Sequence, residues 1–398
     1  MKKLLLIAAL AAVAFGANAD GYKLEKVWEI NDVSFLGANT DARQGFGMNG
    51  KFYINNKKLV VDTIDGVPTV TTAPVVYEVD QNGLTGVTFE GGLNCGITCD
   101  EAGNIIVSNA VFPNVWKEDA TLRVINPETG EVKDHLIPPG CTIEGRCDML
   151  GFAKGNLMED GEIYIVGATQ SGVARIVVID GEVSEDESYI MVCEGVTPTS
   201  STVLNYYVDK NGEEAVLYVT RNAPLRKLAF DGDNFSTSLI TCPGKGATNG
   251  TFPFVWDGME LFIYPTLPNY LDGWAISESD AESPLMEVAP TLAANVNGFQ
   301  CNWFNAEVDD NGVTIYQYCP NHYLAVWRLT KDEPAPEYEI GDVNHDTKVD
   351  VSDVTMLIAY VLGDNNENFF VTEANVNDGD DKIDVGDVTS LIAKILNN

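Results

Sequence analysis

The chain has 398 residues, and its 59 Asp and Glu residues against 24 Lys and Arg residues give a formal net charge of −35. This excess of negative charge excludes a nucleic-acid-binding protein and electrostatic docking on anionic lipid, because both require clustered cations. With 45% hydrophobic and 9% aromatic residues, the chain is not a disordered acidic tail either.

Residues 1–19 read as a secretory signal peptide. Two lysines precede an apolar run that ends in the small residues Ala17, Asn18 and Ala19. This is the pattern of a signal cleavage site, and the run is too short to span a bilayer. We therefore expect a mature chain that begins at Asp20 and is secreted or associated with the cell surface. No cysteine follows the run and no later apolar segment is long enough to cross a membrane, so we expect neither a lipid anchor nor membrane insertion.

One pattern recurs six times between residues 46 and 330. Each copy has a short strand, a tight turn, an apolar second strand and a third strand. The turn glycines are Gly50, Gly103, Gly161, Gly212, Gly258 and Gly312, which lie 46 to 58 residues apart. Such a glycine supplies the positive φ of a tight hairpin, so the strands are expected to be antiparallel. A period of this length is typical of propeller blades.

A fourth, outer strand follows each of the first five copies but not the sixth. Segment 24–30, which precedes the first copy, has the same length and character. If it completes the last blade, the ring closes through its own N-terminus and leaves no open sheet edge. The sequence therefore predicts a mainly β protein in which residues 20–330 form a six-bladed β-propeller. A different blade count and stacked β-sandwiches are the alternatives.

Export makes disulfides chemically accessible, and the chain has eight cysteines. Cys301 and Cys319 flank a predicted hairpin, and Cys141 and Cys147 enclose a short loop, so these two pairs are the favoured disulfides. The spacing of the cysteines does not match the CxxC pattern of zinc sites.

The loops that follow the second strands are expected to share one face with the links between blades. Several of them combine proline, asparagine and aromatic residues, which suit the apolar face and the hydroxyls of a neutral polysaccharide. The alternative is that proline and asparagine form turns while the rings pack between blades. The candidate ligand-binding residues are Phe112, Trp116, Tyr264, Tyr270, His322 and Tyr323.

Motifs for catalysis are missing from the sequence. The three histidines are not at ligand spacing, and GxSxG, HExxH and P-loop motifs do not occur. A glycosidase-type carboxylate pair remains an alternative in so acidic a chain, with Asp41 and Asp148, each near an arginine, as the candidates. We therefore favour a non-catalytic propeller that binds a glycan or a protein, with a glycoside hydrolase or a polysaccharide lyase as the alternative.

Residues 331–340 are rich in proline and acids, as is typical of an extended linker. A twelve-residue loop then begins at Asp342, with oxygen-bearing side chains at positions 1, 3, 5, 9 and 12. With a main-chain carbonyl at position 7, this set matches the six or more oxygen ligands of Ca²⁺. The expected ligands are Asp342, Asn344, Asp346, Lys348, Asp350 and Asp353. The loop leads into an apolar stripe at helical spacing, formed by Val354, Leu357, Ile358, Val361 and Leu362.

The same unit recurs about 34 residues later, with a second apolar stripe after it. Its first two ligand positions lie at an offset of 33 instead, so this loop contains one extra residue. We expect a second, irregular Ca²⁺ site there, in which the choice between Asp378 and Asp380 for the middle ligand stays open. The predicted ligands are Asn375, Asn377, Asp380, Lys382, Asp384 and Asp387.

The duplicated loop and helix, with Asp rather than Glu at position 12, resemble a type I dockerin over residues 341–398. The resemblance implies a small α-helical, EF-hand-like domain that folds around two calcium ions and binds a cohesin-type protein. It also implies attachment to a secreted protein of polysaccharide catabolism. Position 6 of the first loop is Thr347 instead of glycine, which predicts a strained turn. Positions 10 and 11, Val351-Ser352 and Val385-Gly386, differ from the Ser-Thr common in the family, which leaves cohesin specificity open.

Overall fold

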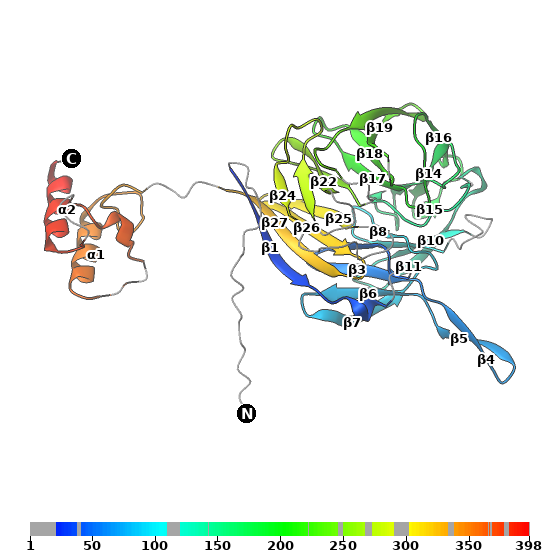
Figure 1. Ribbon diagram of the computed structural model, residues 1–398, viewed down its shortest axis with the longest axis horizontal. Helices are drawn as coiled ribbons and strands as arrows, with labels where there is room; N and C mark the ends of the chain where they lie inside the picture. Colours follow the sequence, from blue (N-terminus) through cyan, green and yellow to red (C-terminus); the bar gives the residue numbers. More distant parts are fainter. Residues whose placement is uncertain are drawn as a thin grey trace. The chain divides into compact units, whose positions relative to one another are not determined.

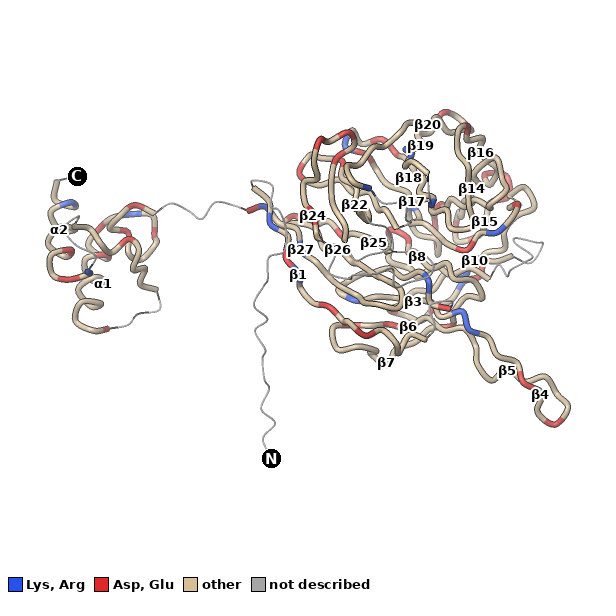
Figure 2. The backbone as a smooth tube through the Cα atoms, in the orientation of Figure 1, with Lys and Arg blue, Asp and Glu red and all other residues tan. Residues whose placement is uncertain are grey.

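The structure is a computed structural model, and the chain in it divides into two compact units, Met1–Asp332 and Glu333–Asn398. The residues that it describes are 21–37, 41–109, 120–141, 143–221, 223–245, 250–266, 273–289, 302–332, 338–364, 366, 368–377 and 382–397. Acidic residues are spread over both units (Figure 2). No helix within these ranges has the length and apolar character needed to cross a membrane.

The N-terminal unit is built mainly of four-stranded antiparallel sheets in a propeller-like arrangement (Figure 1). The first sheet contains β2 (Gly45–Met48), β3 (Lys51–Asn56), β6 (Val75–Asp80) and β7 (Gly83–Glu90). The second contains β8 (Ile97–Cys99), β9 (Ile105–Ser108), β10 (Thr121–Ile125) and β11 (Val132–Leu136). Another contains β21 (Phe252–Trp256), β22 (Met259–Pro265), β23 (Trp274–Ser277) and β24 (Met286–Val288).

The last four-stranded sheet joins the two ends of the unit. It contains β25 (Trp303–Asp309), β26 (Gly312–Cys319), β27 (Tyr323–Lys331) and the N-terminal strand β1 (Tyr22–Ile30). Strand β1 pairs antiparallel with β27, with Leu24 opposite Leu329. The prediction that segment 24–30 completes the last sheet is therefore confirmed, and β27 gains a partner on its outer side.

The middle of the unit is one nine-stranded sheet with two antiparallel halves. The first half contains β12 (Lys154–Gly155), β13 (Gly161–Ile165), β14 (Gly172–Ile179), β15 (Glu182–Val183) and β16 (Tyr189–Cys193). The second half contains β17 (Val203–Val208), β18 (Glu214–Val219), β19 (Leu225–Asp231) and β20 (Asn234–Ile240). The halves join where β16 runs parallel to β20 and pairs Val192 with Asn234 and Cys193 with Phe235.

The remaining elements of this unit are short. A two-stranded hairpin of β4 (Val60–Ile64) and β5 (Val67–Thr72), which the sequence analysis did not predict, extends away from the sheets (Figure 1). Two 3-10 turns, η1 (Ser34–Leu36) and η2 (Pro139–Cys141), lie in connections.

The predicted turn glycines behave alike with one exception. Gly50, Gly103, Gly212, Gly258 and Gly312 have positive φ, as expected for tight hairpins. Gly161 is not among the positive-φ residues, because the turn there is made by residues 156–160. A Cβ at position 161 would lie 2.7 Å from the carbonyl oxygen of Lys154. The absence of a side chain at Gly161 therefore allows the strand that contains Lys154 to approach closely.

The predicted disulfide between Cys141 and Cys147 is wrong. The Cys141 thiol donates to the carbonyl oxygen of Arg175 at 3.3 Å, and the Cys147 thiol donates to that of Met149 at 3.5 Å. Both side chains pack in one buried apolar cluster with Ile143 and Leu150, which directs them to different carbonyls. The other predicted pair includes Cys301, which lies outside the described residues.

The C-terminal unit contains α1 (Val351–Val361), the 3-10 turn η3 (Val371–Glu373) and α2 (Val385–Asn397). Its buried core consists of Val343, Val354, Leu357, Ala374, Val388 and Leu391. Each helix thus buries the first two residues of its predicted apolar stripe. Tyr338–Ile340, predicted as the end of a linker, contact this unit, since Lys394 Nζ donates to the carbonyl oxygen of Ile340 at 2.6 Å.

Candidate functional site

The first predicted calcium loop is folded around two buried carboxylates. Asp342 and Asp353 stand at its two ends and expose only 1% and 0% of their surface. Asp342 accepts backbone N–H groups from Asp346 at 3.1 Å and Thr347 at 2.9 Å. Asp353 accepts those of Asn344 at 3.2 Å and Asp350 at 2.9 Å. The main chain of the loop is therefore wrapped around the carboxylates at its positions 1 and 12.

The end of this loop also starts helix α1. Asp350 is the N-cap residue, and its carboxylate accepts the backbone N–H of Ser352 at 2.7 Å. The Asp353 carboxylate in turn accepts the backbone N–H of Asp350, which completes a capping box. The helix therefore holds two of the predicted ligands at defined positions on its first turn.

The middle of the loop alternates turns with oxygen-bearing side chains. Asn344 Oδ1 accepts the backbone N–H of Asp346 at 2.8 Å, and Asp346 Oδ1 accepts that of Lys348 at 3.0 Å. His345 and Thr347 have φ values of 55° and 71°. Positive φ is costly for a β-branched residue, so the predicted strain at Thr347 is confirmed.

The electrostatics of the loop suit a cation. Within the described ranges, no Lys, Arg or His side chain forms an ion pair with Asp342 or Asp353. Burial raises the pKa of Asp353, the nearby charge of Asp342 adds to this, and backbone hydrogen bonds oppose it. Two buried carboxylates of like charge are costly unless a proton or a cation neutralises them. The donors are all oxygens, which is the ligand type that Ca²⁺ requires.

The carboxylate of Asp346 is turned toward another side chain of the loop. Asp346 Oδ2 accepts the side-chain amide of Asn344 at 3.2 Å. Accordingly, no group of three His, Cys, Asp or Glu side chains in the described part of the chain forms a metal cluster. The loop thus has the oxygen-bearing residue types expected for a calcium site, and the side chain of Asp346 is turned toward Asn344.

The second loop repeats the closing contacts of the first. Asp387 is fully buried and accepts backbone N–H groups from Val376 at 2.9 Å, Asn377 at 3.0 Å and Asp384 at 2.8 Å. Burial acts to raise the pKa of Asp387, but these three hydrogen bonds outweigh it and lower that pKa. The backbone N–H of Asn377 therefore donates to Asp387 as the backbone N–H of Asn344 donates to Asp353. Asn377 lies one position farther from Asp387 than Asn344 lies from Asp353, which agrees with the one-residue insertion. Of the other predicted ligands, Asn375 and Lys382 are among the residues that the structure describes. Asp380 and its alternative Asp378 lie outside them.

Two of the rings predicted to bind a ligand are buried instead. Tyr264 is fully buried, and its hydroxyl donates to the carbonyl oxygen of Pro243 at 2.9 Å. Tyr323 is buried among the apolar side chains of neighbouring sheets. For these two residues the structure agrees with the alternative that the rings pack between blades, because the strand positions direct both rings into the core. His322 is half-buried and its backbone closes a turn onto Cys319. Phe112, Trp116 and Tyr270 lie outside the described residues.

The candidate catalytic residue Asp148 is engaged by arginines. Its side chain is buried, and it forms an ion pair with Arg146 and lies 3.7 Å from Arg43 Nη1. Asp41 is half-buried, and its carbonyl oxygen accepts the backbone N–H of Lys57 at 3.0 Å. The oxygens of the Asp148 carboxylate are occupied by guanidinium groups, which is the pattern of a structural ion pair.

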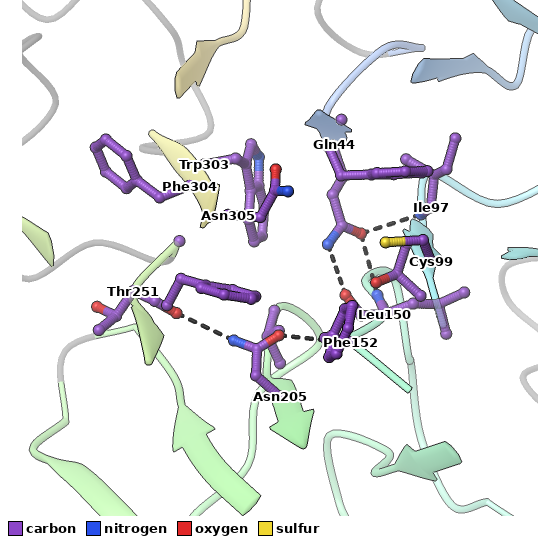
Figure 3. A pocket seen from close by; sticks show the side chains of 16 residues that line it. Gln44, Ile97, Cys99, Leu150, Phe152, Asn205, Thr251, Trp303, Phe304 and Asn305 are labelled. Atoms are coloured by element: carbon purple, nitrogen blue, oxygen red, sulfur yellow. Dashed lines mark hydrogen bonds between the residues drawn. The ribbon is translucent and has the colours of Figure 1, made fainter. Parts of the chain in front are cut away.

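A small pocket lies where the first strands of the sheets meet (Figure 3). Gln44 Oε1 accepts the backbone N–H groups of Ile97 and Leu150, at 3.1 and 3.0 Å. Asn205 accepts the backbone N–H of Phe152 at 3.0 Å and donates to the carbonyl oxygen of Thr251 at 3.1 Å. The pocket volume is about 30 Å³, which is enough for two or three water molecules at roughly 10–15 Å³ each. These amides, which sequence reasoning missed, join neighbouring sheets and leave no room for a sugar.

Comparisons with known proteins identify a fold but no family. No family model matches the chain, and no curated protein matches it. The chain is similar to the crystal structure of a DUF4623 family protein from Bacteroides eggerthii, with a TM-score of 0.51 and 10% sequence identity. The match covers 75% of this chain and 72% of that chain. At this identity, the similarity shows a shared fold alone.

Two further solved structures match more weakly. One is a S. cerevisiae complex of dbp5 with nup159 and gle1, with a TM-score of 0.36, 6% identity and coverage of 79% of this chain and 96% of that chain. The other is a neuraminidase-like protein of A/little yellow-shouldered bat, with a TM-score of 0.41, 9% identity and coverage of 78% and 100%. With TM-scores this low, neither match supports an argument about this chain.

Proposed function

We propose that the chain is an exported docking protein with two parts. The N-terminal unit is a non-catalytic propeller that binds a glycan or a protein. The C-terminal unit is a dockerin-like, EF-hand-like domain that folds around two calcium ions and recruits the propeller to a cohesin-type partner in a polysaccharide-handling assembly. The observation that carries this proposal is the first loop, in which Asp342 and Asp353 are buried together with the main chain wrapped around them.

We further propose that the propeller has six blades. In this interpretation the nine-stranded sheet represents two blades that are joined along their outer strands. Its halves run β12-β13-β14-β16 and β17-β18-β19-β20, which is the same first-to-fourth order as in the separate sheets. Together with the four separate sheets, the two halves match the six sequence repeats.

The chemistry of the loops supports calcium. When bound, Ca²⁺ would neutralise carboxylates that folding has removed from water. In the first loop it would be held by Asp342, Asn344, Asp346, the carbonyl of Lys348, Asp350 and Asp353. In the second it would be held by Asn375, Asn377, Asp380, the carbonyl of Lys382, Asp384 and Asp387.

The exposed sides of the two helices support a protein partner. Leu362 and Leu396 are 83% and 80% exposed, and they occupy equivalent positions in the two copies. Val351 and Val385, together with Ile358 and Ile392, are likewise exposed at matching positions. Apolar side chains that stay in water at the same place in both repeats are typical of a docking surface.

Calorimetric titration of the full chain with calcium tests the proposal. We expect two calcium sites in the unaltered chain and one in Asp353→Ala, because this change removes a buried ligand. Asp364→Ala, which removes an exposed acid outside both loops, is the control and should retain two sites. In circular dichroism, chelator should remove helical signal that calcium restores. Equal helical signal in chelator and in calcium would contradict the proposal of metal-coupled folding.

The competing proposal is a glycoside hydrolase or a polysaccharide lyase. It requires that the full chain release new sugar ends from a polysaccharide and that Asp41→Ala or Asp148→Ala abolish the release. Because Asp148 is engaged by two arginines, we expect neither release nor such an effect.

A further inference from the structure

A groove lies beside the junction of the two halves of the nine-stranded sheet. It is lined by Arg175, Asp186, Glu187, Tyr189, Phe230 and Asp233. Tyr189 begins β16 and Phe230 is on β19, so each half contributes one half-buried aromatic ring. The volume of the groove is about 590 Å³, within the roughly 300–1,000 Å³ that is usual for ligand sites.

The walls of this groove are held in place by the junction. The parallel pairing of β16 with β20 joins the two halves directly behind the lining residues. The Tyr189 hydroxyl donates to Asp233 Oδ1 at 3.4 Å and so links one wall to the other. The Phe230 ring packs on Phe235, with ring centroids 5.0 Å apart. Both rings therefore have defined positions before any ligand arrives, which lowers the entropy cost of binding.

The charges in the groove are acidic on balance. Arg175 binds Glu162 through two hydrogen bonds of 2.9 and 2.8 Å, so its charge is neutralised within the sheet. By contrast, Asp186, Glu187 and Asp233 are exposed, and none of them forms an ion pair within the described ranges. Ionised carboxylates are acceptors only, so a ligand must supply the hydrogen-bond donors.

We propose that this groove binds uncharged sugar units of a polysaccharide. The rings of Tyr189 and Phe230 offer apolar surface to the C–H face of a sugar, and the carboxylates accept hydrogen bonds from its hydroxyls. Acidic sugars such as uronates are repelled by the same carboxylates. The inference rests on the proposed glycan-binding function and places the site at the β16–β20 junction.

Calorimetric titration of the full chain in calcium with neutral hexasaccharides of the cellulose, xylan and mannan types tests the site. We expect at least one of them to bind, and oligogalacturonate not to bind. Tyr189→Ala and Asp233→Asn should each weaken binding by about tenfold, which corresponds to the loss of about 1.4 kcal/mol at a central contact. Glu185→Gln changes an exposed acid of the same loop that does not line the groove, and it should bind as the unaltered chain does.

The possible results separate the two proposals. If a neutral hexasaccharide binds and both groove variants bind it equally well, the site is wrong while glycan binding by the propeller stands. If no neutral hexasaccharide binds, the groove proposal fails, whereas the proposal that the propeller binds a protein stands. Binding restricted to amino-sugar oligomers, with an affinity that falls as salt is added, would overturn the assignment of an uncharged ligand.

Discussion

The imidazole ring of His345 stacks on the phenyl ring of Phe370, with ring centroids 3.5 Å apart and planes within 10°. The ring of Tyr338 covers the other face of the imidazole, also at 3.5 Å. His345 is position 4 of the first loop, whereas Tyr338 precedes the loop and Phe370 lies between the two helices. The Phe370 backbone N–H also donates to the carbonyl oxygen of Val343 at 2.9 Å. Residues outside the loop therefore hold its middle in place.

This stack leads to a prediction about calcium affinity. A stacked aromatic pair contributes about 0.5–1.5 kcal/mol, so Tyr338→Ala should weaken the first calcium site roughly two- to tenfold and leave the second unchanged. Titration calorimetry measures both sites. Tyr360→Ala removes a different stack in the same unit, that of Tyr360 on Phe369 at 4.2 Å, and serves as the control. Equal first-site affinity in the two variants would contradict the positioning role.

Thr347→Gly should stabilise the C-terminal unit in calcium. The left-handed backbone at Thr347 costs about 1–3 kcal/mol for a residue with a side chain, and glycine adopts it without that cost. We expect a net gain of about 1 kcal/mol, because glycine also loses more entropy on folding. Urea denaturation measures the change. Thr355→Gly, inside helix α1, should instead cost roughly 0.3–0.5 kcal/mol. A loss of stability in Thr347→Gly would show that the hydroxyl matters more than the backbone.

The stability of the N-terminal unit should depend on Asp209. Burial acts to raise the pKa of Asp209, but Lys227 at 2.6 Å and two backbone N–H groups outweigh it and lower that pKa to about 2. The ionised carboxylate therefore stabilises the fold when the pH is above 3.8, the ordinary pKa of an aspartate. This contribution is lost as the pH falls from about 4 to about 2.

Asp209→Asn should lower the free energy of unfolding at pH 7 by roughly 1–2 kcal/mol, after allowance for solvent screening. The difference in the free energy of unfolding between this variant and the unaltered chain should become smaller as the pH approaches about 3. Asp231→Asn, which changes an exposed acid on β19, is the control and should have little effect. Denaturant titrations at several pH values give both comparisons. A deficit that stays constant across this range would indicate that charge is not the cause.

Closure of the last sheet by β1 can be tested within that strand. Leu24 is 3% exposed and packs in the core, whereas Val27 lies at a bulge and is 54% exposed. Leu24→Ala should lower the free energy of unfolding by about 2–5 kcal/mol, and Val27→Ala by less than about 0.5 kcal/mol. Thermal and urea unfolding compare the two. Similar small effects would mean that β1 contributes little to closure.

Several features could be predicted because they depend on residues that are near each other in the sequence. The strand pairs follow from alternating apolar residues and turn glycines such as Gly50 and Gly258. The loop and helix units follow from the spacing of Asp342 and Asp353 and of their counterparts. Tyr338, which the sequence analysis assigns to the linker, contacts the first loop through a ring stack that no local pattern indicates.

By itself, the sequence determined the repeated hairpins, the N-terminal strand that completes the last sheet and the paired loops, since each is specified by local spacing and turn chemistry. Only the tertiary structure decided that Tyr264 and Tyr323 are buried, that Asp148 meets Arg43, and that β16 joins β20 beside a groove. The physical reason is that burial and ion pairing depend on which distant strands become neighbours. The pattern of a strand predicts which side chains share a face. The neighbouring sheet determines whether that face is exposed to water or packs against a guanidinium group or another ring.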